Sequence, residues 1–116
     1  MGVATLYGIR NCDTVKKARA WLEAKGVEYR FHDYKASGVE RDRLNRWCKE
    51  LGWEKLLNRS GTTFRALPDS QKHLTNGEQA VKLMLTHPTL IRRPVLELGG
   101  KLVLGFKPEL YQSLKW

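Results

Sequence analysis

The fold at the start of the chain is decided by residues 3–34, which read VATLYGIRNCDTVKKARAWLEAKGVEYRFHDY. Residues 3–7 are β-rich and almost wholly apolar, as expected of a strand buried on both faces. Residues 12–25 carry an apolar stripe at helical spacing, and residues 27–34 alternate between apolar and polar side chains. This order predicts a βαβ unit with a parallel pair of strands.

The rest of the chain passes from helical to strand periodicity. A helix is expected to end at Gly52, and residues 59–68 form a polar loop. A second helix is expected to open with a capping box, Thr75 to Glu78, and to stop at Pro88. Residues 95–106 then predict a hairpin, followed by a short helix. We therefore expect a single α/β domain over residues 1–116, ordered β-α-β, helices, β-β-α, with the helical insertion at about 38–88.

The chain has 116 residues, a formal net charge of +9 and two cysteines, Cys12 and Cys48. Neither cysteine belongs to a CxxC pair, and the three histidines do not have the spacing of zinc ligands. Structural disulfides are rare in reducing compartments. We expect two reduced thiols and no metal.

The sequence has no apolar run long enough to span a membrane and no secretory signal at its start. A cytoplasmic protein without membrane contact is therefore expected. The positive charge either attracts an anionic partner, namely a small oxyanion, an acidic peptide or nucleic acid, or forms a solvated basic surface. Because no nucleic-acid-binding motif is present, nucleic acid is not the expected partner.

Cys12 lies where the first strand gives way to the first helix. Backbone N–H groups and the helix dipole favour a thiolate there, as do Arg10 and Lys16, whereas Asp13 opposes it. The alternative is a small buried cysteine. The polar loop around Cys12, at the carboxyl end of a strand, favours the reactive interpretation. Cys48, beside Trp47 on an apolar helical face, is predicted to pack in the core.

The tripeptide RRP, residues 92–94, precedes the third expected strand. A proline there indicates a cis peptide bond, a kink or an edge strand. The paired arginines either bind an oxyanion or carboxylate through their guanidinium forks, or are solvated. The residues alone leave these alternatives open.

The combination of these motifs resembles the arsenate reductase (ArsC)/Spx family, which has a thioredoxin-like fold, and most closely its YffB-type branch. The resemblance rests on LYGIRNCDTVKKARAWLE, FHDY, LGWEKLLNRSGTTFR and RRPVL, and it covers essentially the whole chain. It implies that Cys12 is the nucleophile, that Pro94 is cis and lies beside the thiol, and that Arg93 binds the oxyanion. Arg10, Asn11 and Arg59 are weaker candidates for substrate binding.

The resemblance also implies the reactants. Arsenate reductases of this family form an arsenate adduct on the cysteine, then use glutathione and glutaredoxin to finish the reduction. Glutathione is therefore the expected co-substrate, glutaredoxin a possible partner, and no bound cofactor is expected.

The sequence differs from the family pattern at several positions. Gly8 stands where arsenate reductases carry an activating histidine, four residues before the cysteine. Asn58 and the pair Gly105–Phe106 correspond to two further arginines, although Arg59 adjoins the first. These differences argue against efficient arsenate reduction. Val15 occupies the place of the second cysteine in Spx regulators, which excludes a two-cysteine switch.

Two hypotheses for the function follow. The first is a monothiol, glutathione-dependent reductase in which the Cys12 thiolate attacks an oxidised or oxyanion substrate. The second is a non-catalytic regulatory module of the Spx kind that binds a protein partner such as RNA polymerase.

Overall fold

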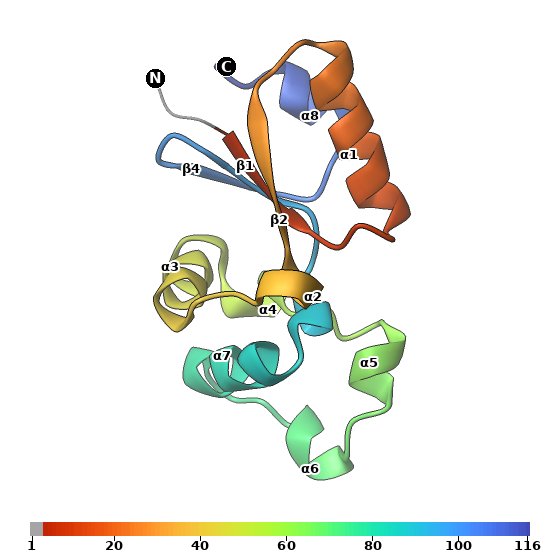
Figure 1. Cartoon of the computed structure of the whole chain (residues 1–116). Helices are drawn as coiled ribbons and strands as arrows, with labels where there is room; N and C mark the ends of the chain where they lie inside the picture. Colours follow the sequence, from red (N-terminus) through yellow and green to blue (C-terminus); the bar gives the residue numbers. More distant parts are fainter. Residues whose placement is uncertain (1–3) are drawn as a thin grey trace. The chain divides into compact units, whose positions relative to one another are not determined.

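The computed structural model describes residues 4–116 and contains one four-stranded sheet within that range. The strands lie in the order β2-β1-β3-β4 (Figure 1). β1 and β2 are parallel, whereas β3 pairs antiparallel with both β1 and β4. The bounds of the strands are β1 Ala4–Gly8, β2 Tyr29–Asp33, β3 Val95–Leu98 and β4 Lys101–Leu104. The predicted βαβ unit and the later hairpin are both confirmed.

Helices account for most of the remaining regular structure. The longer ones are α1 Asp13–Ala24, α3 Arg41–Leu51 and α7 Gly77–Thr86. The short ones are α2 Tyr34–Ser37, α4 Trp53–Leu56, α5 Thr62–Arg65, α6 Asp69–Lys72, the 3-10 turn Pro88–Leu90 and α8 Pro108–Gln112. The arrangement is a thioredoxin-like α/β fold, as the sequence predicted.

The chain divides into two compact units. One contains the residues up to Tyr34 together with Arg93–Trp116, and so holds the whole sheet. The other is the helical segment Lys35–Arg92. The insertion expected at about 38–88 falls inside this second unit, and the single domain over residues 1–116 stays a prediction.

The core of the sheet unit lies between one face of the sheet and the helices α1 and α8, which Figure 1 shows side by side. The apolar stripe of α1 supplies Val15, Ala18 and Leu22, all fully buried. Ala4 and Leu6 of β1 pack against this stripe because alternate residues of a strand share a face. The apolar residues within positions 4–22 therefore determine which face of the sheet α1 covers.

The start of α7 differs from the expected one. The capping box predicted between Thr75 and Glu78 is wrong, because Asn76 is the N-cap residue and its side chain accepts a hydrogen bond of 2.9 Å from the Gln79 amide. The Gln79 side chain in turn accepts one of 2.8 Å from the Thr75 amide. Thr75 stands three residues before Glu78, and Asn76 stands three residues before Gln79. The capping-box pattern therefore fits either residue as the N-cap.

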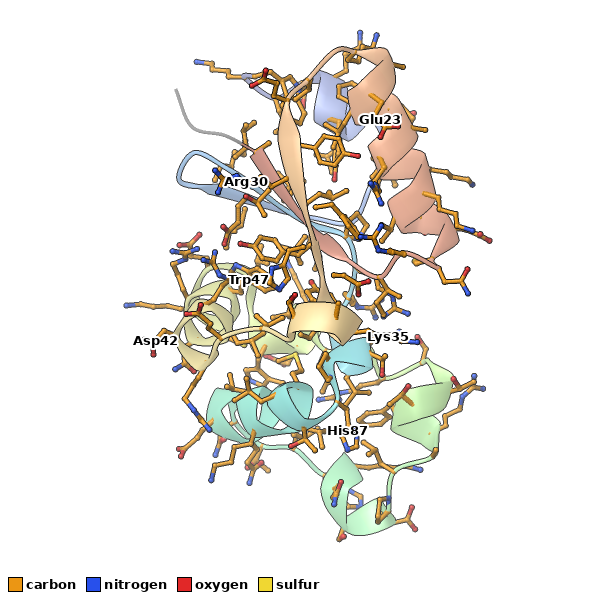
Figure 2. All side chains as sticks on the ribbon, viewed as in Figure 1. Glu23, Arg30, Lys35, Asp42, Trp47 and His87 are labelled. Carbon is orange, nitrogen blue, oxygen red and sulfur yellow. The ribbon has the colours of Figure 1, made fainter. Side chains whose placement is uncertain are left out.

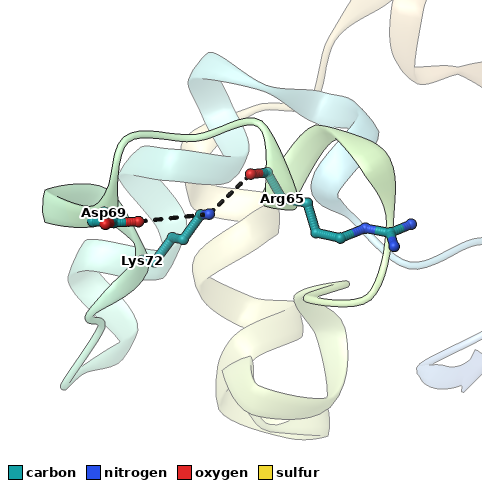
Figure 3. A network of polar contacts seen from close by, with 3 residues as sticks. All are labelled: Arg65, Asp69 and Lys72. Atoms are coloured by element: carbon teal, nitrogen blue, oxygen red, sulfur yellow. Dashed lines mark hydrogen bonds and ion pairs between the residues drawn. The ribbon is translucent and has the colours of Figure 1, made fainter.

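The polar loop expected over residues 59–68 contains a helical turn, α5, which corrects that prediction. Phe64 is buried in this turn and gives it an apolar anchor. Further along, Lys72 donates a hydrogen bond of 2.9 Å to the Arg65 carbonyl and lies 3.8 Å from an Asp69 carboxylate oxygen (Figure 3). Lys72 therefore ties the end of α5 to α6.

Tyr111 of α8 is fully buried among Trp21, Phe106 and Trp116, and burial raises the pKa of its hydroxyl. That hydroxyl has no hydrogen-bond partner within residues 4–116. Because an unsatisfied buried hydroxyl is destabilising, we expect Tyr111→Phe to raise the unfolding free energy by about 1 kcal/mol, measured by thermal denaturation.

The same variant should change the response to alkali. The folded-state pKa of Tyr111 is raised, so its contribution to stability is complete below the unfolded-state pKa of about 10 and is lost as the pH rises above it. Tyr111→Phe should therefore lose less stability than the wild type above pH ~10. The control is Tyr29→Phe, since the Tyr29 hydroxyl is hydrogen-bonded to Arg19 and Glu23. Equal stabilisation by both variants would contradict this account.

In residues 4–116, no helix combines the length and the hydropathy that crossing a bilayer requires.

Candidate functional site

Cys12 occupies the N-cap position of the 12-residue helix α1. Its backbone is extended, with φ −122° and ψ 125°, and its carbonyl accepts the first helical hydrogen bond, 2.9 Å from the Lys16 amide. Its side chain makes no capping hydrogen bond, and the residue is half-buried. The first N–H groups of the helix have no intrahelical partner, and the helix dipole is positive at this end. The position is therefore suited to stabilising negative charge on sulfur.

The Cys12 loop and the Arg93–Pro94 segment lie at the same end of the sheet. Tyr7 of β1 pairs with Val95 of β3. β1 therefore ends, at Gly8, beside the point where β3 begins after Pro94. The Arg93–Pro94 peptide bond is cis, which confirms that expectation. Pro94 is buried, and its carbonyl accepts a hydrogen bond of 2.8 Å from the Gly105 amide.

Gly8 is in close contact with the first turn of α1. A Cβ atom built on Gly8 would lie 2.7 Å from Cγ2 of Val15, closer than real side chains approach. Val15 is itself fully buried. The residue four places before the thiol therefore lacks a side chain because Val15 fills the space that it would need.

Arg10 and Asn11 form the exposed turn before Cys12. Nε of Arg10 lies 3.6 Å from a carboxylate oxygen of Asp33, and its guanidinium carbon lies 5.4 Å from the centroid of the Phe31 ring. The Arg10 side chain is 71% exposed. Two contacts from β2 thus hold the guanidinium near the Cys12 loop while leaving it accessible to solvent.

Arg93 is half-buried and lies close to Tyr34. Burial raises the pKa of the Tyr34 hydroxyl, the positive charge of Arg93 lowers it, and Tyr7 and Glu97 raise it. The Tyr7 hydroxyl donates a hydrogen bond of 3.1 Å to a Glu97 carboxylate oxygen. Arg93 therefore belongs to a polar cluster with these three side chains.

Arg59 belongs to the helical unit, where its guanidinium carbon lies 5.3 Å from the centroid of a Trp53 ring. The preceding residue, Asn58, accepts hydrogen bonds from the amide and the hydroxyl of Ser60. Backbone hydrogen bonds join Asn58 to Leu90 and Arg92 to Leu56, each 2.8 Å long. The Arg59 loop is thus paired with the segment that leads into Arg93, whereas the other candidate residues belong to the sheet unit.

Cys48 lies on α3 and is half-buried rather than fully enclosed, so it belongs only partly to the expected core. Burial raises the pKa of its thiol. Cys12 and Cys48 are both free cysteines. The Cys48 thiol is therefore less nucleophilic at neutral pH than a fully solvated thiol.

Sequence reasoning missed Arg19, which lies seven residues after Cys12 on α1. Its guanidinium carbon lies 4.3 Å from the Phe31 ring centroid, and its Nε donates a hydrogen bond of 3.0 Å to the Tyr29 hydroxyl. Phe31 is thus contacted by two guanidinium groups, those of Arg10 and Arg19. The available signal was the alternation of Tyr29, Phe31 and Asp33 along one face of β2.

Within the described part of the chain, residues 4–116, no three His, Cys, Asp or Glu side chains are grouped so as to hold a metal ion.

This site and fold define a thioredoxin-like protein with a single thiol in the loop after β1. The ArsC family model matches residues 7–114, and the chain belongs to the ArsC family. Among solved structures, it is similar to the YFFB (PA3664) protein, with a TM-score of 0.92, 54% identity, and coverage of 96% of this chain and 97% of that one.

Two curated relatives extend the comparison. An uncharacterized protein of Haemophilus influenzae is 38% identical over 109 residues, which are 94% of this chain and 96% of that protein. The global transcriptional regulator Spx 2 of Bacillus anthracis is 28% identical over 109 residues, covering 92% of this chain and 82% of the regulator. The chain is thus similar both to the YFFB protein and to Spx regulators.

Proposed function

We propose that the protein is a monothiol reductase in which the Cys12 thiolate attacks an oxidised thiol substrate and glutathione completes the reduction. The observation that carries the proposal is the thiol at the N-cap of α1, without a side-chain cap, at the end of β1. The helix N-terminus can stabilise negative charge that develops on sulfur, and Cys12 is half-exposed to a reactant.

The reaction consists of thiol–disulfide exchanges. The Cys12 sulfur bonds to one sulfur of the substrate disulfide, whose S–S bond breaks and whose other half leaves as a thiolate. A glutathione thiolate then attacks the Cys12 sulfur of that mixed disulfide, so that the second half of the substrate leaves as a thiolate and glutathione becomes bonded to Cys12. A second glutathione restores the Cys12 thiolate and departs as oxidised glutathione. Two glutathione molecules are thus oxidised for each disulfide reduced.

The first N–H groups of α1 would stabilise negative charge on the sulfur atoms during these exchanges. Arg93 is proposed to bind an anionic group of the substrate, with Arg10, Asn11 and Arg59 in weaker supporting roles and Pro94 beside the thiol. Glutaredoxin is a possible partner in regenerating the thiol. Cys48 is not assigned the resolving role, because burial raises its pKa.

Intact-protein mass spectrometry after incubation with oxidised glutathione tests this mechanism. We expect one glutathionyl adduct per chain, located at Cys12 by peptide mapping, with Cys48 unmodified. Cys12→Ser should acquire no adduct, and Cys48→Ser should react as the wild type does. If the folded wild-type protein stays unmodified, the proposed mechanism is wrong.

The similarity to Spx 2 favours a second candidate, a regulatory module that binds a protein partner such as an RNA polymerase subunit. Val15 stands at the place of the second cysteine in Spx regulators, so this module would not use a dithiol switch. The discriminating measurement is affinity capture with purified RNA polymerase. Stoichiometric binding that is unchanged in Cys12→Ser would favour this candidate over the reductase.

A further inference from the structure

We propose that Arg19, together with Arg10, binds a carboxylate of the small thiol or disulfide that reacts at Cys12. This inference rests on the proposed reductase function and adds the substrate's recognised group. Arg19 was not among the residues that the sequence motifs indicated. The inference follows from the contacts of Arg19 on the face of β2 that carries Phe31 and Tyr29.

The Arg19 guanidinium is held in place by two aromatic side chains. Its carbon atom lies 4.3 Å from the Phe31 centroid, and its Nε donates to the Tyr29 hydroxyl at 3.0 Å. The Tyr29 hydroxyl donates in turn to a Glu23 carboxylate oxygen at 3.1 Å. Tyr29, Glu23 and Phe31 are therefore positioning residues. They hold the planar Arg19 guanidinium in one orientation, and its two terminal nitrogens are thereby preorganised for a ligand.

The charge of Arg19 is met indirectly, because the Glu23 carboxylate accepts from the same Tyr29 hydroxyl that binds Arg19 Nε. Among residues 4–116, no carboxylate lies within salt-bridge distance of Arg19, whose polar contact is the neutral Tyr29 hydroxyl. The guanidinium of Arg10 lies over the same Phe31 ring and has a direct carboxylate neighbour, Asp33 at 3.6 Å. Two like charges around one ring repel each other, and a bound anion relieves that repulsion. A carboxylate matches the planar fork of each guanidinium.

The distance along α1 suits a small ligand that also reaches the thiol. Arg19 lies seven residues after Cys12, which is about two helical turns on the same face, or roughly 10 Å. The Arg19 guanidinium lies over Phe31, the ring that Arg10 also contacts, whereas its Nε is bound to Tyr29, which pairs with Ala4 at the start of β1. Arg10 lies two residues before Cys12. A peptide-sized thiol with a terminal carboxylate spans this distance, whereas a simple oxyanion bonded to sulfur does not.

The test compares two disulfides and matched arginine variants. Second-order rate constants for modification of Cys12 are measured with oxidised glutathione and with its dimethyl-ester form, whose glycyl carboxylates are blocked. We expect Arg19→Gln to slow the reaction with oxidised glutathione by about tenfold and to leave the ester reaction unchanged. Arg19→Lys should recover only part of the rate, because it keeps the charge and loses the fork.

Arg30→Gln is the control for overall charge. Arg30 is an exposed arginine of β2 whose side chain lies on the side of the strand away from α1 (Figure 2). It should leave both rates unchanged, and melting temperatures establish that each variant is folded. Equal slowing by Arg19→Gln and Arg30→Gln, or equal slowing of both disulfides by Arg19→Gln, would overturn the carboxylate site. Failure of both disulfides to modify wild-type Cys12 would instead overturn the proposed reductase.

Discussion

Replacing Cys12 with serine should lower the rate of glutathione-dependent disulfide reduction by about 10³-fold or more. The hydroxyl of serine is a far weaker nucleophile than a thiolate at neutral pH, and it cannot form the mixed disulfide on which both later exchanges depend. The measurement is steady-state reduction of a low-molecular-weight disulfide, followed through oxidised glutathione with glutathione reductase and NADPH.

Cys48→Ser is the matched control for this prediction. Cys48 is half-buried on α3, and burial raises the pKa of its thiol, so its loss should leave the rate unchanged. The structural effect of Cys12→Ser should be small, because serine is itself a favoured N-cap residue. A Cys12→Ser variant that retains the wild-type rate would place the reactive thiol elsewhere, and loss of rate in Cys48→Ser would indicate a resolving cysteine.

The sequence predicted the sheet unit well because its local patterns and its tertiary packing agree. The apolar stripe of α1, the alternation along β2 and the hairpin pattern of residues 95–106 each specify an element that the structure contains. Pro94 also carries a local signal, and its cis peptide bond was among the alternatives that it indicated. The position of Cys12 at the start of α1 could be predicted from the order of strand and helix alone.

The features that escaped prediction depend on contacts between elements. Arg19 lies off the apolar stripe of its helix in sequence, and its contacts depend on how Phe31 and Tyr29 of β2 lie against α1. The short helix α5 depends on burial of Phe64. The cap of α7 was one residue from its expected place because Thr75 and Asn76 both satisfy the local pattern. Contacts with neighbouring elements thus account for the first two features, and two equivalent local registers account for the third.

The contact between Gly8 and Val15 predicts the second large effect. Gly8→His should destabilise the protein by about 3 kcal/mol or more, because its Cβ would lie 2.7 Å from a buried Val15 methyl group and the ring needs further space. Gly8→Ala should cost about 1 to 3 kcal/mol for the same contact. Chemical denaturation with urea gives both values.

Val15→Ala in the same chain shows whether steric overlap is the cause. Alone, this substitution should destabilise the protein, since it removes two buried methyl groups. In combination with Gly8→His it should recover part of the lost stability, because it removes the atoms that the histidine meets. The double-mutant cycle should therefore give a favourable interaction energy of about 1 kcal/mol or more. Additive losses of unfolding free energy would show that contact with Val15 is not the reason why residue 8 is glycine.

The same double variant connects the glycine to the chemistry of Cys12. The arsenate reductases that this sequence resembles carry a histidine at the position of Gly8, and that histidine helps to activate their cysteine. If Val15 is what excludes that histidine here, the folded Gly8→His/Val15→Ala variant should alkylate at Cys12 faster than Val15→Ala does at pH 7. An unchanged alkylation rate in a folded double variant would mean that the Cys12 loop of this protein does not accept activation from that position. Activation of the Cys12 thiol would then depend on the N-terminus of α1 alone.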